Sequence, residues 1–428
     1  MIDIKLIREN SKAVKENIKK KFQNEKLPYV DKVIKLDEEW RKIKYKADEL
    51  RSQKNKLSEE INKSMKAKDK KNAKELIKKA KEIPSKLEKI EVKSKKLESE
   101  IKELMYKIPN MMHKSVPIGK DETKNKEIKK IGKPLKSKYE IFNHAELAEK
   151  LGGVDFDTAR ETSGKGFYYL KGDLSLLHMA VMNFARDYML KQGFEFVYPP
   201  LMIRKEVVDG VMSFEEMDAM MYKIEGEDLY LIGTSEHPLI GMFMNRKLRK
   251  KDLPYKITGF SPCFRKEVGA HGLEEKGFFR VHQFDKQEMI VICDINDSYS
   301  WYDKMLKYTL DVFKALDIPS RVLEICSGDL ADLKAKSCDV EAWSPRQGKY
   351  FEVGSLTNME EAQARRLNIR IEGEGKIYFA HTLNNTVIAS PRALIALMEN
   401  NQQKDGSIKI PKALQSYMNG KKKIEVKK

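Results

Sequence analysis

Charged and aromatic residues that could hold a nucleotide beside an amino acid are concentrated in two short segments of the chain. The first is Phe264-Arg265-Lys266-Glu267, and the second runs from Arg280 to Glu288 and includes Phe284. Both segments have the character of paired strands, so their side chains are expected to share one surface. Guanidinium groups bind phosphate and carboxylate oxygens through forked donors. The combination indicates an enzyme that activates an amino acid with a nucleoside triphosphate.

Several common catalytic and nucleotide-binding motifs are missing from the sequence. It contains no G-x-x-x-x-G-K-[ST] phosphate loop, no G-x-G-x-x-G after a strand, no H-E-x-x-H and no G-x-S-x-G. If the chain binds ATP, we therefore expect arginines on a sheet to hold the phosphates, in place of a glycine-rich loop.

The composition predicts a globular chain of two domains that does not enter a membrane. The chain has 428 residues, of which 41% are hydrophobic, enough for a large core. It has no apolar run of roughly eighteen residues that could span a bilayer, and its N-terminus lacks the apolar segment of a signal peptide. The cysteines, at positions 263, 293, 326 and 338, have no CxxC spacing and are predicted to be buried free thiols. A cytoplasmic protein is expected.

Apolar residues recur at heptad spacing through much of the first 110 residues. Two such series lie at about 30–62 and 73–108, and a polar segment separates them. Alternating three- and four-residue spacing is typical of a coiled-coil seam, so the two helices are expected to pair as an antiparallel hairpin. Helices of this length form an arm roughly 45 Å long. Pro84 is expected to kink or interrupt the second helix.

The positive charge of the chain is concentrated in the same segment. Of the formal net charge of +18, residues 1–110 carry +13, from 33 Lys and Arg against 20 Asp and Glu. A cationic rod attracts polyanions by releasing their counterions, so the arm is expected to bind the backbone of structured RNA. A lysine-rich helix surface that is only solvated is the alternative.

The chain changes character after the second helix. Proline and glycine residues mark 111–135 as a polar linker. Beyond it, residues 136–428 contain a helix-like stretch at 174–191 and strand-like runs such as 255–264 and 278–291. Because several strands follow one another without crossover helices, we expect an α+β domain with a mainly antiparallel sheet flanked by helices.

Three segments of this second domain resemble the motifs of class II aminoacyl-tRNA synthetases. Residues 193–200 resemble motif 1, residues 264–288 motif 2, and residues 384–403 motif 3. More narrowly, the chain is similar to the seryl-tRNA synthetases from residue 1 to about 425. Further segments that carry this resemblance are Ile7-Arg8-Glu9-Asn10, Ile108-Pro109-Asn110, Thr234-Ser235-Glu236, Glu352-Val353-Gly354-Ser355 and Gln363-Ala364-Arg365-Arg366. The resemblance implies a tRNA-binding helical domain at 1–110 and a class II catalytic domain at 136–428.

The resemblance implies a two-step reaction. Serine attacks ATP to give seryl-adenylate and pyrophosphate, and the 3′ end of tRNA(Ser), with tRNA(Sec) as a further candidate, then takes the seryl group. Arg265, Glu352 and Arg392 would be the catalytic residues, with Arg265 bridging the serine carboxylate and the α-phosphate. Arg280 and Arg392 would hold the outer phosphates. The implied ATP site consists of Arg265, Lys266, Glu267, Arg280, Val281, Phe284, Glu352, Val353, Gly354, Ser355 and Arg392.

The same resemblance implies contacts to adenine, to a cation and to serine. Glu267 would accept a hydrogen bond from the adenine amino group, and Phe284 would stack on the ring. Glu352 and Ser355 match the family's magnesium segment, and a carboxylate with a hydroxyl suits a hard cation such as Mg²⁺. An isolated glutamate on a strand would otherwise be read as a salt-bridge partner. The implied serine site consists of Thr234, Ser235, Glu236, Arg265, Glu288 and Thr386. The run Thr234-Ser235-Glu236 alone also fits a helix capping box.

The chain departs from the family pattern at several places, and two of these concern ligand contacts. Asn385 stands where motif 3 commonly has glycine, and it is expected to alter how closely the backbone approaches the ligand. The loop between Val268 and Gly277, which the family uses at the tRNA acceptor end, lacks the threonine and arginine that are common just before this glycine.

The resemblance also implies partners. The chain is expected to form a homodimer through the motif 1 helix and strand, and the arm is expected to contact tRNA(Ser) by shape and phosphate charge. No membrane and no DNA partner is expected. The alternatives are a catalytically inactive, synthetase-like paralogue that only binds tRNA, an arm with a purely structural role, and a ligase that acts on a carrier protein.

Overall fold

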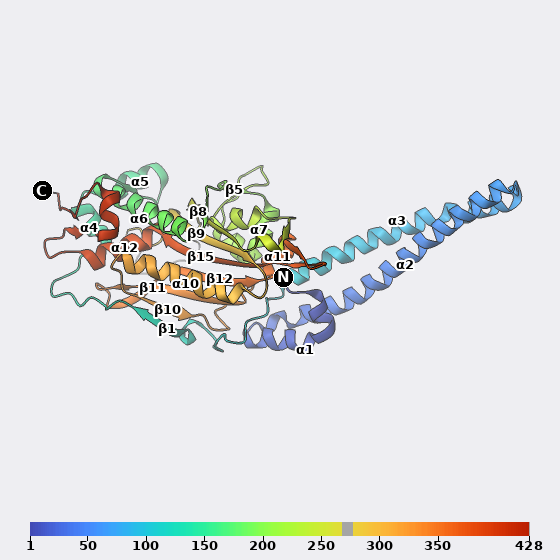
Figure 1. Ribbon diagram of the computed structural model, residues 1–428, viewed down its shortest axis with the longest axis horizontal. Coiled ribbons are helices and arrows are strands. Elements are labelled where there is room, and N and C mark those ends of the chain that lie inside the picture. Colours follow the sequence, from blue (N-terminus) through green and yellow to red (C-terminus); the bar gives the residue numbers. More distant parts are fainter. Residues whose placement is uncertain (268–276, 428) are drawn as a thin grey trace. The chain divides into compact units, whose positions relative to one another are not determined.

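The computed structural model describes residues 1–267 and 277–427, which fall into two compact units (Figure 1). One unit comprises Ile2–Lys19 and Gln23–Pro109 and is helical. The other comprises Asn110–Lys428 with Met1 and Lys20–Phe22, and it contains the β-sheets. Each unit has its own set of packing contacts.

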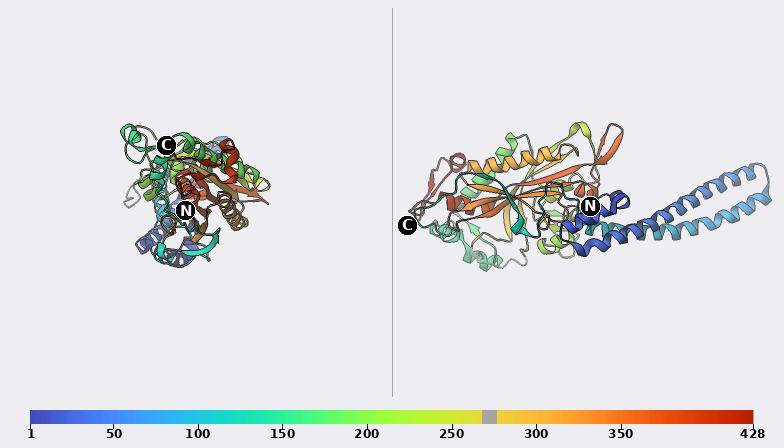
Figure 2. Two further views of the ribbon diagram at one scale, coloured as in Figure 1. Left: turned by 90° about the vertical axis from the view of Figure 1, so that its left-hand side faces the viewer. Right: turned by 90° about the horizontal axis from the view of Figure 1, so that it is seen from below.

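The helical unit is a hairpin of two long helices preceded by a shorter one. Helix α1 spans Ile4–Lys20, α2 spans Leu27–Lys66 and α3 spans Lys70–Lys107. Helices α2 and α3 lie side by side over their whole length (Figures 1 and 2), which confirms the predicted antiparallel hairpin. Helix α3 continues through Pro84, so the predicted interruption does not occur. Pro84 is exposed and lies outside the apolar seam, so the helix loses one backbone hydrogen bond there but none of the seam contacts.

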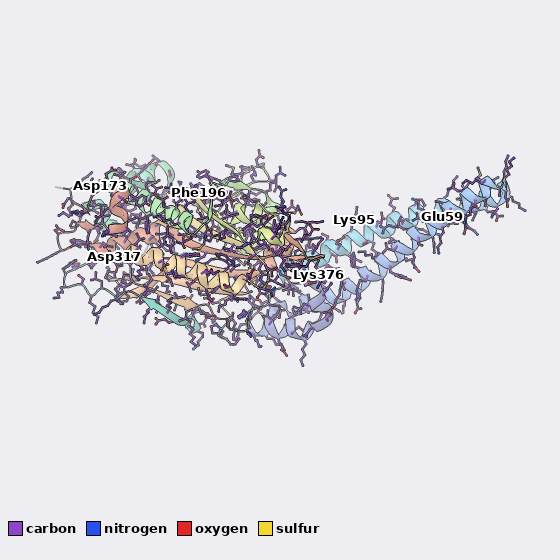
Figure 3. All side chains as sticks on the ribbon, in the orientation of Figure 1. Glu59, Lys95, Asp173, Phe196, Asp317 and Lys376 are labelled. Atoms are coloured by element: carbon purple, nitrogen blue, oxygen red, sulfur yellow. The ribbon has the colours of Figure 1, made fainter. Side chains whose placement is uncertain are left out.

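The predicted apolar seam holds the hairpin together. Lys54, which occupies one position of the first apolar series, is exposed. The apolar residues of the two series are all buried or half-buried: Val33, Leu36, Trp40, Ile43, Ala47, Leu50, Leu57 and Ile61 in the first, and Ala73, Leu76, Ala80, Ile83, Leu87, Ile90, Leu97, Ile101, Leu104 and Ile108 in the second. Salt bridges of 2.7 Å join Arg51 to Glu91 and Lys93 to Glu39 across the helices, but such exposed pairs contribute little stability. Figure 3 shows side chains projecting outward along both helices. The seam therefore supplies the stability, and the charged residues form the outer surface.

The turn of the hairpin is shorter than the polar segment suggested. Only Ala67–Asp69 separates the two helices. Lys68 adopts a left-handed conformation with φ of 58°, and the Asp69 carboxylate caps α3 by accepting a hydrogen bond from the Asn72 amide. The Asn72 side chain donates to the Ser64 hydroxyl at 3.0 Å across the helices. Polar residues on both sides of the turn thus continue the helices, because their hydrogen bonds are satisfied locally.

The second unit is built on an eight-stranded sheet with the order β1-β10-β11-β12-β15-β9-β8-β4. These strands are β1 (Lys126–Ile131), β10 (Ser320–Glu324), β11 (Lys336–Ser344), β12 (Lys349–Glu360), β15 (His381–Ala389), β9 (Gln283–Cys293), β8 (Tyr255–Phe264) and β4 (Glu195–Val197). Among the strands described, neighbours in this sheet run antiparallel except the edge pair β4 and β8. The mainly antiparallel sheet is therefore confirmed. Strand β1 lies inside the segment predicted as a linker.

Helices α6 (Gly172–Lys191), α10 (Ser298–Ala315) and α12 (Ser390–Asn401) pack on one face of this sheet and enclose the larger core. The remaining helices are α4 (His144–Lys150), α5 (Phe156–Ser163), α7 (Lys205–Val211), α8 (Phe214–Met220), α9 (Glu236–Gly241), α11 (Ala362–Leu367) and α13 (Lys412–Gln415). Short strands form smaller sheets: β2 (Val154–Asp155), β3 (Tyr169–Leu170), β5 (Met202–Ile203), β6 (Tyr230–Leu231), β7 (Lys247–Arg249), β13 (Arg370–Gly373), β14 (Lys376–Phe379), β16 (Ile408–Lys409) and β17 (Lys423–Ile424).

The alternation of side chains along β9 decides which residues face which side of the sheet. Met289 and Val291 belong to the larger core, whereas Ile290 and Ile292 belong to a second core that packs against α9 and α11. Successive side chains of a strand point to opposite faces. The even-numbered residues Phe284, Lys286 and Glu288 therefore share the face that α6, α10 and α12 leave uncovered.

The predictions about cysteines and membrane spans can be compared with the structure. All four cysteines are free and buried, which confirms that prediction. Within residues 1–267 and 277–427, the structure has no helix that is both long and apolar enough to cross a bilayer.

Candidate active site

A cleft of about 410 Å³ opens on the face of the sheet that α6, α10 and α12 do not cover. It brings together Arg265, Glu352 and Arg392, which come from three separate segments of the chain. The predicted site residues that line it are Thr234, Glu236, Arg265, Glu267, Arg280, Val281, Phe284, Glu288, Glu352, Val353, Gly354, Ser355, Thr386 and Arg392. The dispersed motifs thus converge on one surface.

Two predicted site residues do not line the cleft. The Ser235 side chain is buried and donates a hydrogen bond to the Gly259 carbonyl at 3.1 Å. The Lys266 ammonium lies 3.4 Å from the Asp218 carbonyl. Ser235 therefore fixes the start of α9 against β8, and Lys266 attaches the end of β8 to α8.

Arg265 is held immediately after the last residue of β8. Its backbone amide donates to the His282 carbonyl at 2.9 Å, so it continues the pairing with β9. Its Nε atom donates to the Gly233 carbonyl at 3.1 Å, and the guanidinium carbon lies 5.2 Å from the centre of the Phe284 ring. The two terminal nitrogens have no partner among the described residues. The side chain is thus fixed at its middle and free to bind an anion at its end.

Arg280 and Glu267 face each other at the exposed end of the cleft. Their side chains approach to 3.5 Å, and the Arg280 side chain is 52% exposed. Glu267 has a φ of 49°, a left-handed conformation that is uncommon for a residue with a side chain. Both residues lie beyond the strand ends, not within the strands as the sequence suggested.

A carboxylate with an unused oxygen lies at the base of the cleft. The Thr234 hydroxyl donates to Oε1 of Glu288 at 2.6 Å, and the Lys286 ammonium pairs with the same oxygen. The second oxygen, Oε2, is buried and has no partner among the described residues. A buried acceptor without a donor is costly, so a ligand hydroxyl or ammonium at this point would be stabilising.

Two neighbouring residues of α9 have strongly shifted pKa values. Burial and the nearby Glu288 carboxylate raise the pKa of Glu236 to about 7, although Gln363 donates a hydrogen bond of 2.9 Å to its Oε1 atom. Burial and Arg265 lower the pKa of His237 to about 3. At neutral pH the base of the cleft therefore contains a neutral imidazole and a carboxyl group close to its titration point.

A second acidic group lies where β11 and β12 pair. Arg392 donates from one terminal nitrogen to Oε2 of Glu352 at 2.9 Å and to the Glu352 carbonyl at 3.1 Å. Burial opposes ionisation of Glu352, but Arg392 outweighs it, and the pKa of Glu352 falls below its usual value. Asp339 pairs with Ser355 across the strands, and burial together with Glu352 raises the pKa of Asp339 to about 6.

These oxygen atoms fit a magnesium ion. Glu352 and Ser355 supply one carboxylate and one hydroxyl, with Asp339 beside them. Over the described ranges, no group of three or more His, Cys, Asp or Glu could enclose a metal. Mg²⁺ usually keeps several waters and takes one or two protein carboxylates together with phosphate oxygens. The residues therefore suit a cation that arrives with a nucleotide, and they do not suit a fully protein-bound metal.

Motif 3 alternates across β15. Asn384 and Thr386 line the cleft, whereas Asn385 points to the other face and donates to the Met305 carbonyl and the Thr309 hydroxyl, each at 2.9 Å. Asn385 thus attaches β15 to α10 and does not reach the cleft. A Cβ atom at Gly354 would lie 3.1 Å from Cβ of Thr386, so glycine at that position permits the close approach of β12 and β15.

The cleft also contains residues that the sequence did not indicate. Lys286, Asp339 and Phe279 line it, and the Phe279 ring centre lies 5.0 Å from the Arg392 guanidinium. Lys286 could have been found, because it alternates with Phe284 and Glu288 on one strand. The loop assigned to the tRNA acceptor end, residues 268–276, lies outside the described residues.

Two family models match the chain. The class II tRNA synthetase core domain, which serves the enzymes for G, H, P, S and T, matches residues 220–401. The seryl-tRNA synthetase N-terminal domain matches residues 1–112. The first match contains most residues of the described cleft, and the second contains the helical hairpin.

Individual relatives are similar over most of the chain. A serine–tRNA ligase of Methanocella arvoryzae is 48% identical over 72% of this chain and 73% of its own length. A crystal structure of seryl-tRNA synthetase from Pyrococcus horikoshii complexed with ATP is 42% identical, with a TM-score of 0.93 and full coverage of both chains. The cytoplasmic serine–tRNA ligase of Naegleria fowleri in complex with AMP is 33% identical, with a TM-score of 0.88 over 100% of this chain and 99% of that one.

Proposed function

The chain belongs to the seryl-tRNA synthetase family of aminoacyl-tRNA synthetases, and we propose that it joins L-serine to tRNA(Ser) in two steps driven by ATP. The observation that carries this proposal is the single cleft shared by Arg265, Glu352 and Arg392. The test is ATP–pyrophosphate exchange with each amino acid in turn, followed by charging of total tRNA with the active one. Exchange that depends on serine supports the proposal, and exchange with another amino acid or with none contradicts it.

The first step needs two anions to meet, and the cleft supplies the compensating charge. A serine carboxylate oxygen attacks the α-phosphorus of ATP, and pyrophosphate leaves with the electron pair of the broken bond. The unpartnered terminal nitrogens of Arg265 would bridge the carboxylate and the α-phosphate, while Arg280 and Arg392 would bind the outer phosphates. Phe284 would stack on adenine and Glu267 would accept from its amino group. No side chain becomes covalently bound, so rate enhancement comes from positioning and charge stabilisation.

Selection of serine would depend on Glu288, Thr234, Glu236 and Thr386. The unused Oε2 atom of Glu288 would accept a hydrogen bond from the substrate hydroxyl, and alanine would leave that buried oxygen unpaired. Thr234 and Glu236 would lie near the substrate ammonium, and Thr386 would complete the pocket. Rejection of threonine then follows from volume.

Serine binding is expected to weaken below neutral pH. Because the pKa of Glu236 is raised to about 7, this carboxyl group loses its charge as the pH falls and can no longer pair with the ammonium. We expect KM for serine to rise roughly fivefold to tenfold between about pH 7.5 and pH 6. In the Glu236→Gln variant, KM should be raised at every pH but should not change across this range. Parallel pH profiles for the two proteins would disprove the role of Glu236.

The magnesium ion would bind through Glu352 and Ser355. When bound, it supplies positive charge to the phosphate oxygens and orients the triphosphate. The Glu352 carboxylate is already ionised beside Arg392, and the Ser355 hydroxyl is held next to Asp339. These residues therefore present oxygen ligands without a prior change in protonation of Glu352.

The second step would use the helical arm as the tRNA-binding element. Its tip carries Lys63, Lys66, Lys68, Lys70 and Lys71, all exposed. Phosphate contacts position a nucleic acid without reading its bases, so the arm would recognise tRNA(Ser), with tRNA(Sec) as a further candidate, by shape. The 3′ hydroxyl of the bound tRNA would attack the seryl carbonyl carbon, and AMP would leave. The intact charged residues of the cleft disfavour the inactive, tRNA-binding alternative.

A homodimer would bury apolar residues that one chain leaves exposed. Leu176, Met179 and Leu190 lie exposed on α6, and Phe196, labelled in Figure 3, and Tyr198 lie exposed on and after β4. Strand β4 is also an edge of the large sheet. An unpaired edge beside exposed apolar residues is a common interface.

We place the protein in the cytoplasm, where its four free thiols would stay reduced.

Replacing Tyr198 by glutamate should weaken self-association at least about tenfold, because the charge would be buried at the interface. Light scattering during size-exclusion chromatography over a dilution series measures the dissociation constant. The control is Ile377→Glu, since Ile377 is similarly exposed but lies on β14. Equal effects of the two substitutions, or a monomeric wild type, would contradict the proposed interface.

A further inference from the structure

Asp285 lies on β9 between two residues of the cleft but faces the opposite side of the sheet. Phe284 and Lys286 line the cleft, and the side chain between them is directed toward the helices that cover the other face. There the Asp285 carboxylate meets His178 on α6, with Nε2 of His178 2.8 Å from Oδ2. Because a carboxylate only accepts hydrogen bonds, Nε2 must carry the proton.

The backbone of Asp285 is joined to the start of α12. The last paired residues of β9 and β15 are Lys286 and Ala389. Beyond them the backbone amide of Asp285 donates a hydrogen bond of 3.1 Å to the hydroxyl of the buried Ser390. The Ser390 side chain thus takes the place of the backbone carbonyl that would continue the pairing of the two strands. Burial and the Asp285 carboxylate raise the pKa of Tyr168.

These contacts connect α6 to β9 and α12, the two elements that carry Phe284 and Arg392 into the cleft. Ser390 is the first residue of α12, and Arg392 follows two residues later, where it reaches Glu352. Phe284 is bonded directly to Asp285 and lies under Arg265. A shift of Asp285 would therefore move both the ring expected to stack on adenine and the turn that presents Arg392. Glu288 and Thr234, in contrast, are held by their own hydrogen bond.

We propose that His178, Asp285 and Ser390 form a positioning network for the ATP half of the cleft, a role that rests on the proposed function. None of the three lines the cleft. Their hydrogen bonds fix the backbone at Phe284 and Arg392, in the way that buried partners commonly orient the groups that bind a ligand. The network should therefore affect binding of ATP without affecting binding of serine.

The experiment compares His178→Leu and Ser390→Ala with the wild type in ATP–pyrophosphate exchange. Removal of one buried hydrogen bond should raise KM for ATP about tenfold, while KM for serine stays within about twofold. His178→Gln, which keeps a side-chain donor, should recover most of the loss. The double variant should resemble the single ones, because both substitutions disconnect the same carboxylate-centred network.

A matched control is His381→Leu. His381 is buried at the other end of β15, and its Nδ1 atom lies 2.9 Å from the Ser298 hydroxyl, so its loss disturbs a similar buried pair. The control should lower thermal stability and leave both KM values unchanged. Parallel increases in KM for ATP and serine, or a loss of stability with unchanged KM for ATP, would refute the positioning role. If the wild type does not exchange with serine, the proposed function is refuted instead. Calorimetric titration with ATP then tests the positioning network separately, because it measures ATP affinity in the wild type and the variants without any reaction.

Discussion

Replacement of Arg265 by alanine is expected to reduce serine-dependent pyrophosphate exchange by about 10³-fold or more. Arg265 is the residue whose terminal nitrogens remain unpartnered among the described residues of the cleft while its Nε atom is fixed to Gly233. A guanidinium already held in place loses little conformational freedom when the transition state forms. Its positive charge therefore stabilises the negative charge that develops on the phosphoryl oxygens. Loss of a single arginine at a transferring phosphoryl group has effects of this size.

Lysine at position 265 should restore only part of the activity, because an ammonium ion cannot bind the carboxylate and the phosphate with two parallel donors. The control is Arg249→Ala, since Arg249 is exposed on β7, pairs with Asp252 at 2.6 Å and does not line the cleft. Activity of the Arg265→Ala variant within about tenfold of the wild type would remove this residue from the proposed mechanism.

The part of the site that lies on the sheet could be predicted, because successive side chains of a strand alternate strictly between its two faces. Tyr255–Phe264 is a strand in the structure with the predicted bounds, and the second segment pairs with it as expected. What lies beyond the strand ends was less predictable. Arg265 and Glu267 belong to an irregular segment whose conformation depends on contacts with Gly233 and Arg280. Local sequence carries no signal for such long-range contacts.

Other parts of the site depend on pairing between distant segments. Asp339 enters the cleft only because β11 pairs with β12 in a register that places it opposite Ser355. Ser235 has a side chain that could bind a ligand, but its hydroxyl donates a hydrogen bond to the Gly259 carbonyl of β8 instead. Asn385 differs from the family pattern at a position that faces α10. Residue identity alone could not separate these cases, because the strand register decides which face each side chain takes.

The arm illustrates the opposite case. Its helix ends were predicted within about four residues, because a heptad seam depends only on nearby positions and on one partner helix.

The cleft and the arm are also separate in the sequence, which suggests that they serve different steps of the reaction. Every residue that lines the cleft lies between Val211 and Arg392, whereas the helical hairpin ends at Lys107. Chemistry on serine and ATP should therefore not require the hairpin.

Deletion of residues 30–108, with a short glycine-serine bridge in their place, is the second prediction with a large expected effect. Serine-dependent pyrophosphate exchange should stay within about threefold of the wild type, because in the proposed mechanism serine and ATP would bind only in the cleft. Charging of tRNA(Ser) should fall by about 10³-fold or more, since the deletion removes the lysines that would position the tRNA through its phosphates. Equal decreases in both assays would contradict the division of labour.

A full-length variant removes the objection that the deletion disturbs folding. Alanine at the five tip lysines, Lys63, Lys66, Lys68, Lys70 and Lys71, leaves the seam intact, because all five are exposed. The slope of log affinity for tRNA against log salt should become shallower by roughly one for each phosphate that the variant no longer neutralises. The matched control changes five exposed lysines of the sheet unit: Lys126, Lys129, Lys130, Lys133 and Lys136. An arm that binds RNA predicts a shallower slope for the tip variant alone, whereas equal slopes in the two variants would mean that only net charge matters.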